Sequence, residues 1–334
     1  MSHLLIEFDL AGAEWVVVAY LAGDANMLGV VASGKSPHVV TGALISKASE
    51  EFVLEEYKAV GSHTDPDTIA SLRKNLEIPR GIFLPRSLSI RQAGKKSNHG
   101  CNYYMRYRRF ALENGMPETD AEPIVAFYSQ VAYPGLNDYW EGIKGELRSN
   151  KRALTNCFGR KATLMGEWGV DLFMAAYAFK PQSTVFDVCR AGMIRAYNDE
   201  SPEFQNARLG AQVHDSLMIG YPLPQTKDDW YDLCRVLDRM TREHMISELH
   251  YKGAVDGVER DFKLSSDAKL GINWGTMHGV KVTQDYDALI LQVQEALSLS
   301  QDPLAAVAES EWLATAHLDQ GLPLTSQDPP LEVS

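Results

Sequence analysis

The chain starts with an apolar segment, residues 3–8, that predicts a buried β-strand running into Asp9. A helical pattern follows over residues 12–22 and ends at Gly23. A carboxylate at the end of a buried strand is held rigidly, as a metal ligand should be. A single aspartate after a strand is more often a turn residue or a helix cap. One carboxylate rarely holds a catalytic Mg²⁺ alone, so such a site needs a second carboxylate.

The pattern downstream of this strand is first mainly helical and then mixed. Helices are expected at 27–32, 39–47, twice within 48–85, at 86–114, from a cap at Thr119 or Asp120 to about 132, and at 136–149. The second half predicts a hairpin at 154–164, a long helix at 171–198 broken at 179–183, strands at 208–213 and 216–221, a helix at 227–249 and a strand at 254–264. We interpret the chain after Ser298 as a linker or a loosely held tail.

The second carboxylate is Asp215, which lies with His214 in a tight turn between the two apolar strands at 208–213 and 216–221. Its place mirrors that of Asp9, because each aspartate adjoins the end of an apolar strand. The pair is the candidate for a metal site.

A row of four side chains lies near one face of the helix predicted at 86–114. Arg91, Lys95, His99 and Tyr103 are spaced by four residues, so the row drifts by only about 40° per step and spans roughly 18 Å. Cations bind phosphate oxygens, and rings stack on a base or a sugar. The alternative is a solvated basic face with two half-buried rings. Together with two strand-end carboxylates, however, this row supplies the parts for two-metal phosphoryl transfer.

Charge, cysteines and hydropathy limit the setting. The net charge is −12, but basic residues cluster at 91–109 and 144–161, and residues 301–334 hold six acidic residues and no Lys or Arg. The four cysteines are scattered without metal-type spacing, as in a reducing compartment. We find no signal peptide, and the longest apolar run, 15–22, is too short to span a bilayer. A cytoplasmic location is expected.

Several motifs carry a resemblance to one family. Asp9-Leu10-Ala11-Gly12-Ala13-Glu14 resembles the first palm motif of family A DNA polymerases, the group of bacterial DNA polymerase I and its phage relatives. The row Arg91-x₃-Lys95-x₃-His99-Gly100-x₂-Tyr103 resembles their fingers-helix motif, and residues 212–215 their second palm motif. Residues 133–135, 155–160 and 182–187 match further segments in order, so the resemblance covers about residues 4–280.

The resemblance implies an α+β fold with an antiparallel-sheet palm and a mainly helical fingers subdomain. It assigns residues 1–35 and 166–283 to the palm, 36–165 to the fingers and 284–334 to an acidic tail. The interval between His38 and Arg91 is longer than usual for the family, which suggests an insertion at 48–85. The thumb and exonuclease domains are expected to be absent. The hypothesis is then one half of a split polymerase, completed by a second polypeptide that carries the thumb, with or without the exonuclease domain. The resemblance implies the cytoplasm of a bacterium or of a phage-infected host.

The resemblance also implies a role for each matching position. Asp9, Asp215 and the Leu10 carbonyl would hold two Mg²⁺ ions; Arg91, Lys95, His99, Tyr103, Glu14 and His38 would bind the deoxynucleoside triphosphate; Gln182, Arg160, Thr155 and His214 would contact the template–primer DNA. Lys95 would protonate the leaving pyrophosphate. Glu14 would lie under the sugar and exclude a 2′-hydroxyl.

Three positions depart from the family pattern. His99 stands where the family has Phe or Tyr, so its stacking on the nucleotide should differ. Ser216 replaces an auxiliary acidic residue, and Ala178 stands where the family often has Asn, which removes a polar contact to the template–primer.

Three functions compete. The favoured one is the catalytic portion of a template-directed DNA polymerase. A single-subunit RNA polymerase shares the palm plan, but Glu14 as a sugar gate argues against it. A non-catalytic subunit that binds DNA or a partner polymerase should have lost Asp9, Asp215, Arg91 and Lys95, because metal ligands add nothing to stability.

Overall fold

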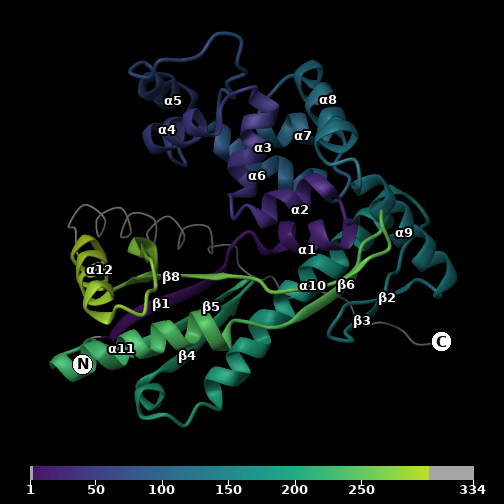
Figure 1. Cartoon of the computed structure of the whole chain (residues 1–334). Helices are drawn as coiled ribbons and strands as arrows, with labels where there is room; N and C mark the ends of the chain where they lie inside the picture. Colours follow the sequence, from purple (N-terminus) through teal and green to yellow (C-terminus); the bar gives the residue numbers. More distant parts are fainter. Residues whose placement is uncertain (1–2, 301–334) are drawn as a thin grey trace, which may run out of the picture.

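The computed structural model describes residues 3–300, which form a sheet part and a helical part (Figure 1). The sheet part holds a five-stranded antiparallel sheet in the order β4-β5-β1-β8-β9. The strands are β1 His3–Leu10, β4 Arg208–Val213, β5 Ser216–Pro222, β8 Ser266–Gly271 and β9 His278–Val280. Two hairpins lie apart: β2 Ala153–Thr155 with β3 Lys161–Thr163, and β6 Leu249–Lys252 with β7 Glu259–Phe262. This mixture of helices and antiparallel sheet confirms the predicted α+β class.

Helices make up most of the rest. The helical part contains α2 Ala25–Ala32, α3 Pro37–Ser46, α4 Glu50–Val60, α5 Pro66–Arg73, α6 Ile90–Cys101, α7 Tyr107–Asn114 and α8 Glu118–Phe127. The others are α1 Ala13–Ala22, α9 Leu136–Ser149, α10 Val170–Tyr197, α11 Lys227–Arg239 and α12 Tyr286–Ser300. No helix within residues 3–300 is both long and apolar enough to cross a membrane.

Strand β1 is the centre of the sheet. Its residues alternate between buried and half-buried, with Leu4, Ile6, Phe8 and Leu10 pointing into the core. It pairs antiparallel with β5 on one side and with β8 on the other. The backbone N–H of Leu10 also donates to the carbonyl oxygen of Asp215 at 3.1 Å. The end of β1 is thus fastened to the turn between β4 and β5.

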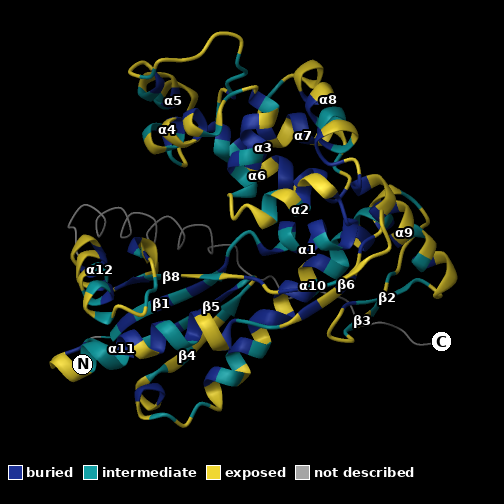
Figure 2. Ribbon diagram, in the orientation of Figure 1, coloured by how far each residue is buried: buried dark blue, intermediate teal, exposed yellow. Residues whose placement is uncertain are grey.

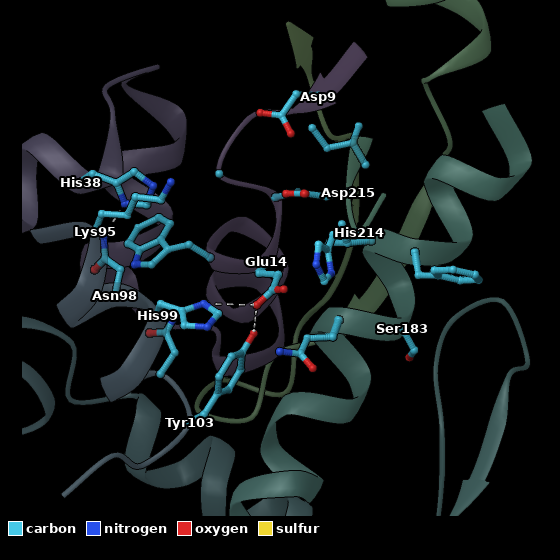
Figure 3. Close-up of a pocket in the computed structure, with 18 of the residues that line it drawn as sticks. Asp9, Glu14, His38, Lys95, Asn98, His99, Tyr103, Ser183, His214 and Asp215 are labelled. Atoms are coloured by element: carbon cyan, nitrogen blue, oxygen red, sulfur yellow. Dashed lines mark hydrogen bonds and ion pairs between the residues drawn. The ribbon is translucent and has the colours of Figure 1, made fainter. Parts of the chain in front are cut away.

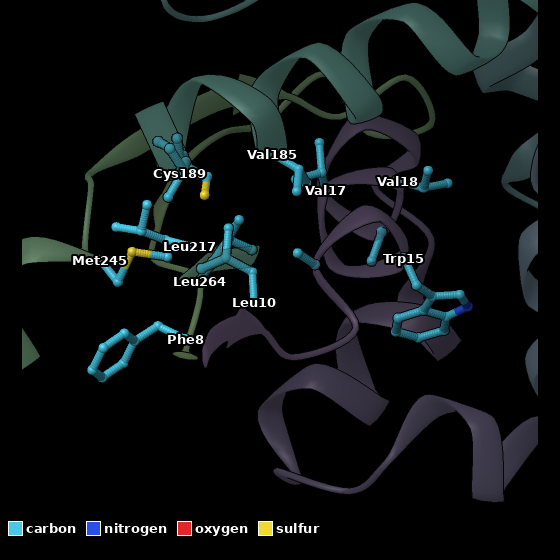
Figure 4. Packing of buried hydrophobic residues seen from close by; sticks show 14 of the residues in the cluster. Phe8, Leu10, Trp15, Val17, Val18, Val185, Cys189, Leu217, Met245 and Leu264 are labelled. Carbon is cyan, nitrogen blue, oxygen red and sulfur yellow. The ribbon is translucent and has the colours of Figure 1, made fainter. Parts of the chain in front are cut away.

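The main core lies between the sheet and two helices. Val17 of α1 and Val185 and Cys189 of α10 are buried with Leu10 and Leu217 of the sheet (Figure 4). Figure 2 shows buried residues along the sheet and the helices next to it, whereas exposed residues are frequent on α4, α5 and α8. This core packs α1 and α10 against each other and against the end of β1.

The proline predicted to break α10 does not break it. The helix is continuous over 28 residues, with Pro181 inside it. Proline has no N–H, so the carbonyl four residues earlier, that of Tyr177, loses its helical donor. The Tyr139 hydroxyl of α9 donates to this carbonyl at 2.5 Å and replaces the missing donor. The helix therefore continues because a neighbouring helix supplies the hydrogen bond.

The prediction of a single helix at 86–114 is wrong. α6 ends at Cys101, and Tyr104 has a left-handed backbone with φ 67°. The Tyr104 ring packs edge-on against Trp140, with ring centroids 4.8 Å apart. Tertiary packing of one aromatic ring thus divides an otherwise continuous helical pattern into α6 and α7.

Smaller boundary predictions also fail. Pro117 rather than Thr119 or Asp120 occupies the N-cap of α8. α11 ends at Arg239 in a π-turn, because Arg195 of α10 donates to the carbonyl oxygens of His244 and Ile246 and holds that segment. The segment 254–264, predicted as one strand, contains the turn and the second strand of the hairpin β6–β7.

The structure describes the expected tail at 284–334 as far as residue 300. This part is not a tail, because it packs on the sheet. α12 buries Leu289, Val293 and Leu297 in the main core and packs on β8 and β9. Neither α12 nor the strands β8 and β9 were predicted from the sequence. The remainder of the expected tail, residues 301–334, lies outside the described residues.

Helices α3 and α6 cross so closely that two glycines meet. A Cβ atom on Gly94 would lie 2.2 Å from the His38 carbonyl oxygen and 2.6 Å from the Gly42 backbone nitrogen. A Cβ atom on Gly42 would lie 2.8 Å from the Ile90 carbonyl oxygen. Contacts this short require glycine at both positions.

We predict that Gly94→Ala lowers the free energy of unfolding by about 2 kcal/mol or more, because the added methyl forces two backbones apart. Urea unfolding followed by circular dichroism measures the change. Gly145→Ala is the matched control, since nothing lies within 4 Å of a Cβ atom there, and it should be neutral or slightly stabilising. Equal effects of the two substitutions would contradict the close crossing.

Candidate active site

A cavity of about 880 Å³ lies where β1, α1, α6, α10 and the β4–β5 turn meet (Figure 3). Most residues predicted for the site line it: Asp9, Leu10, Glu14, His38, Lys95, His99, Tyr103, Gln182, His214 and Asp215. Arg91, Arg160 and Thr155 are not among its lining residues. Asp9 and Asp215, at opposite ends of a long stretch of sequence, therefore meet at one site.

The two predicted carboxylates lie at the same end of this cavity. Asp9 is opposite Ser216 in the β1–β5 register, so it lies beside the turn that holds Asp215. Burial, with Asp215 and Glu7 adding repulsion, raises the pKa of Asp9 from 3.8 to about 6, although Lys269 at 3.9 Å partly offsets this. Negative charge is crowded here beyond what the chain itself neutralises.

This crowding is what a cation site requires. Carboxylate oxygens are the ligands that Mg²⁺ prefers, and a bound dication would relieve the repulsion between Asp9 and Asp215. No group of three or more His, Cys, Asp or Glu side chains within residues 3–300 is arranged to hold a metal. The protein would thus supply two carboxylates, and further ligands would have to come from backbone, water or substrate. Ser216 cannot act as a third carboxylate, and its hydroxyl donates to the Val213 carbonyl at 3.1 Å.

The turn that carries Asp215 has a strained residue. His214 has φ 53°, in the left-handed region that few non-glycine residues occupy. Its side chain lines the cavity next to Asp215. Strain of this kind persists only where the surrounding structure holds it, and here the tight pairing of β4 with β5 does so.

On the opposite wall, Glu14 of α1 is bound by Tyr103, which lies two residues beyond the end of α6 rather than on the predicted helix row. The Tyr103 hydroxyl donates to Glu14 Oε2 at 2.7 Å, and His99 Nδ1 lies 3.8 Å from the same oxygen. Burial and the nearby Glu14 charge raise the pKa of Tyr103 well above its ordinary range, so it remains a donor. Figure 3 shows these three side chains converging on one point of the cavity.

Asn98 is a site residue that sequence analysis missed. Its amide nitrogen donates to the Pro37 carbonyl at 3.1 Å, which fixes the amide orientation, and it contacts His38 Nδ1 at 3.1 Å. Its oxygen accepts from the Tyr128 hydroxyl at 2.9 Å. The only signal in the sequence was an amide one position before His99, and a polar helix residue of that kind is usually exposed.

Asn98 decides how His38 presents its ring. Burial and the charges of Arg91, Lys95 and His99 lower the pKa of His38 to about 4, so the imidazole is neutral at pH 7. Because Nδ1 accepts a hydrogen bond from Asn98, the proton is on Nε2. His38 therefore offers a neutral N–H donor from Nε2.

Three predicted residues lie outside the cavity. The Arg91 guanidinium lies over the Tyr57 ring, 4.6 Å from its centroid. Arg160 forms a bidentate pair with Asp187 of α10, at 2.6 and 2.9 Å. Thr155 is the last residue of β2, and Arg160 lies in the turn between β2 and β3. Gln182, on the exposed side of α10, does line the cavity.

The fold is that of a polymerase domain. A solved structure entitled "POL domain of Pol1 from M. smegmatis complex with DNA primer-template and dNTP" superposes with a TM-score of 0.55 and 17% identity, over 82% of this chain and 40% of that chain. At this identity the likeness shows the fold alone.

The chain belongs to the family A DNA polymerases. The family model described as "DNA polymerase family A" matches residues 86–276, more than half of the chain. Thermostable DNA polymerase I of Thermus thermophilus is 25% identical over 227 residues, and that of Thermus filiformis is 25% identical over 225. Each alignment covers 66% of this chain and 23% of the relative, so the chain matches about a quarter of the length of these curated proteins.

We predict that Asp9→Asn stabilises the metal-free protein above pH 6. The raised pKa means that the unfolded chain releases the Asp9 proton first, so the free energy of unfolding falls between about pH 4 and 6 and then stays level. A rise of the Asp9 pKa from 3.8 to about 6 would be worth about 3 kcal/mol in full. The Asp9 side chain is 35% exposed, and solvent screening reduces the expected gain to about 1 kcal/mol.

Urea unfolding between pH 3.5 and 8 in EDTA tests this prediction. Glu55→Gln, an exposed carboxyl on α4, is the control and should have little effect at any pH. A gain for Asp9→Asn that persisted unchanged at pH 3.5 would contradict the electrostatic origin.

Proposed function

We propose that this chain is the catalytic portion of a template-directed DNA polymerase, which adds deoxynucleotides to a primer 3′ end with release of pyrophosphate. The observation that carries the proposal is the single cavity in which Asp9 and Asp215 face the Lys95 and His99 side of α6. Family membership supports the same activity. The phage-type assignment and the division into palm and fingers are part of this proposal.

The two carboxylates would hold the metal. Asp9, Asp215 and the Leu10 carbonyl are the proposed ligands of two Mg²⁺ ions, and the mutual repulsion of the carboxylates supports such a site. When bound, Mg²⁺ supplies activation of the primer hydroxyl and neutralisation of charge on the leaving group. Lys269 remains beside Asp9, where it limits the repulsion in the absence of metal.

Residues of α3 and α6 would bind the incoming triphosphate. Lys95 and Arg91 carry the positive charge that phosphate oxygens need, and Lys95 Nζ would donate a proton to the leaving pyrophosphate. The neutral His38 would add an N–H donor from Nε2 without adding charge. His99 would pack against the base or sugar, with Tyr103 behind it, since their ring centroids are 6.0 Å apart.

Glu14 would select the sugar. Tyr103 already occupies Glu14 Oε2, so a 2′-hydroxyl arriving there would find little space and an acceptor in use. This occupied acceptor favours deoxynucleotides and counts against the RNA polymerase alternative.

The duplex would lie along α10 and the β2–β3 hairpin. Gln182 and His214 line the cavity at its α10 side, where a primer end would approach the carboxylates. Arg160 and Thr155 would contact the DNA from the hairpin. Asp187 uses part of the Arg160 guanidinium, which fixes its orientation and leaves its remaining N–H groups for DNA.

A non-catalytic subunit that binds DNA or a polymerase is the second candidate. A second polypeptide that carries a thumb, with an exonuclease domain, also stays a prediction, as does a cytoplasmic location. Primer extension by the purified chain distinguishes the catalytic proposal from the non-catalytic subunit.

We predict that Asp215→Asn reduces primer extension by the purified chain about 10³-fold or more, because a lost metal ligand removes several kcal/mol of transition-state stabilisation. Extension of a labelled primer–template with Mg²⁺ and four deoxynucleotides measures the rate. Glu55→Gln is the matched carboxyl-to-amide control and should retain full activity.

A parent chain that fails to extend the primer would be assayed again with lysate from the native source. Rescue that disappears with Asp215→Asn indicates a required second polypeptide. An absence of rescue would refute catalysis and favour the non-catalytic subunit.

We predict that Glu14→Gly raises ribonucleotide incorporation relative to deoxynucleotide incorporation by about tenfold or more, equivalent to about 1.4 kcal/mol of lost discrimination. Single-nucleotide incorporation with dATP and ATP gives the ratio of kcat/KM. Tyr103→Phe, which removes the hydroxyl that holds Glu14, should change the ratio in the same direction and by less. An unchanged ratio in Glu14→Gly would remove Glu14 from sugar selection.

A further inference from the structure

The segment of residues 48–85, which carries α4 and α5, has no role in the site described so far. It lies outside the stretch matched by the family model, which begins at residue 86. Figure 1 shows α4 and α5 at the outer end of the helical part, next to α3 and α6. We call it the α4–α5 segment.

A small separate core joins this segment to the start of α6. Phe52 and Val53 of α4 are buried with Val39 and Ala43 of α3 and with Ile90. Ile90 is the first residue of α6 and is fully buried. The amino end of α6 is therefore packed against α4 rather than free in solvent.

A buried ion pair fastens the same point. Glu56 of α4 is 0% exposed and accepts from the Arg73 guanidinium of α5 at 2.9 Å. The other Glu56 oxygen accepts from the backbone N–H of Ile90 at 2.9 Å. Arg73 also donates to the carbonyl oxygens of Pro85 and Leu88. One pair of side chains thus fixes both the approach to α6 and its first residue.

Surface contacts continue along the first turn of α6. The Tyr57 ring lies under the Arg91 guanidinium, 4.6 Å from its centroid, and Gln92 Nε2 donates to Ser62 Oγ at 2.9 Å. Arg91 lies one helical turn before Lys95 on α6, and Lys95 lines the cavity. Tyr57 therefore holds Arg91 near the cavity without entering it.

The charge of the segment argues against direct binding of nucleic acid. Residues 48–85 contain seven acidic residues and four basic ones, and one of the basic residues, Arg73, is buried in the ion pair. A negative surface repels phosphate. An influence of the segment on the site would therefore pass through α3 and α6, the helices on which α4 packs.

We propose that the α4–α5 segment is a brace that fixes the amino end of α6, and that Tyr57 is a positioning residue for Arg91 in nucleotide binding. The second part rests on the proposed function, because it takes Arg91 as a ligand of the triphosphate. The first part depends only on the folded chain.

Hydrogen exchange of the full chain tests the brace. Glu56→Gln leaves Arg73 buried without a charge partner, and amides of residues 85–92 should exchange at least about tenfold faster, while those of β1 and β5 keep their protection. Glu55→Gln, its exposed neighbour on α4, is the matched control and should exchange like the parent. Unchanged exchange at 85–92 in Glu56→Gln would overturn the brace.

Equilibrium binding of dATP to the full chain with Mg²⁺ tests the positioning role. Tyr57→Ala should weaken binding about two- to fivefold, the usual strength of an exposed cation–π contact. Tyr57→Phe retains the ring and should bind like the parent. Leu54→Ala, 46% exposed on the same helix, is the control for a general effect of α4.

The Arg91→Ala background separates the two proposals. In it, Tyr57→Ala should have no further effect, because Tyr57 acts through Arg91. Equal weakening by Tyr57→Ala with and without Arg91 would overturn the positioning role. If Arg91→Ala itself left dATP binding unchanged, the assignment of Arg91 to the triphosphate would fail and the positioning role with it, whereas hydrogen exchange would still decide the brace. Should Glu56→Gln raise exchange throughout the chain, the brace is judged on Tyr57→Ala, which must raise exchange at 85–92 alone.

Discussion

The site depends on the pairing of β1 between β5 and β8. This register sets Asp9 beside the turn that holds Asp215, and the hydrogen bond from Leu10 N–H to the Asp215 carbonyl closes the end of the ladder. A shift of one residue in β1 would turn Asp9 into the core and Leu10 out of it. The alternating burial of Leu4, Ile6, Phe8 and Leu10 opposes that shift. The hydrophobic packing of β1 therefore also fixes the position of the Asp9 carboxylate.

One wall of the cavity is positively charged, although the net charge of the chain is negative. The protein is acidic overall, yet α6 presents Lys95, with Arg91 one turn away, toward two carboxylates on the sheet. Burial raises the pKa of Asp9 and lowers that of His38, and like charges on the same wall add to each shift. An anion and cations bound together would satisfy both walls at once, which is the charge pattern of a metal–triphosphate complex.

Local patterns predicted which residues meet in one cavity better than they predicted the elements around it. The strand into Asp9, the turn at Asp215 and the four-residue spacing on α6 are short-range features, and most of these side chains meet in one cavity. The failures have tertiary causes. Tyr104 ends α6 because its ring packs on Trp140, and Pro181 stays helical because Tyr139 replaces a lost donor. The role of Asn98 could not be predicted for the same reason. Its side chain is oriented by hydroxyl and carbonyl partners that are far away in the sequence.

The glycine contact between α3 and α6 has a mechanical consequence. Because Gly42 and Gly94 bring two backbones within van der Waals distance, the two helices cannot slide or rotate past each other without a steric clash. We therefore expect them to move as one unit, to which α4 is attached through Ile90. Any displacement of α6 relative to the sheet would carry His38 and Lys95 with it in unchanged mutual geometry. A hinge for such a displacement must lie outside this unit, in segments such as residues 33–36 or 102–106 that connect it to the rest of the chain.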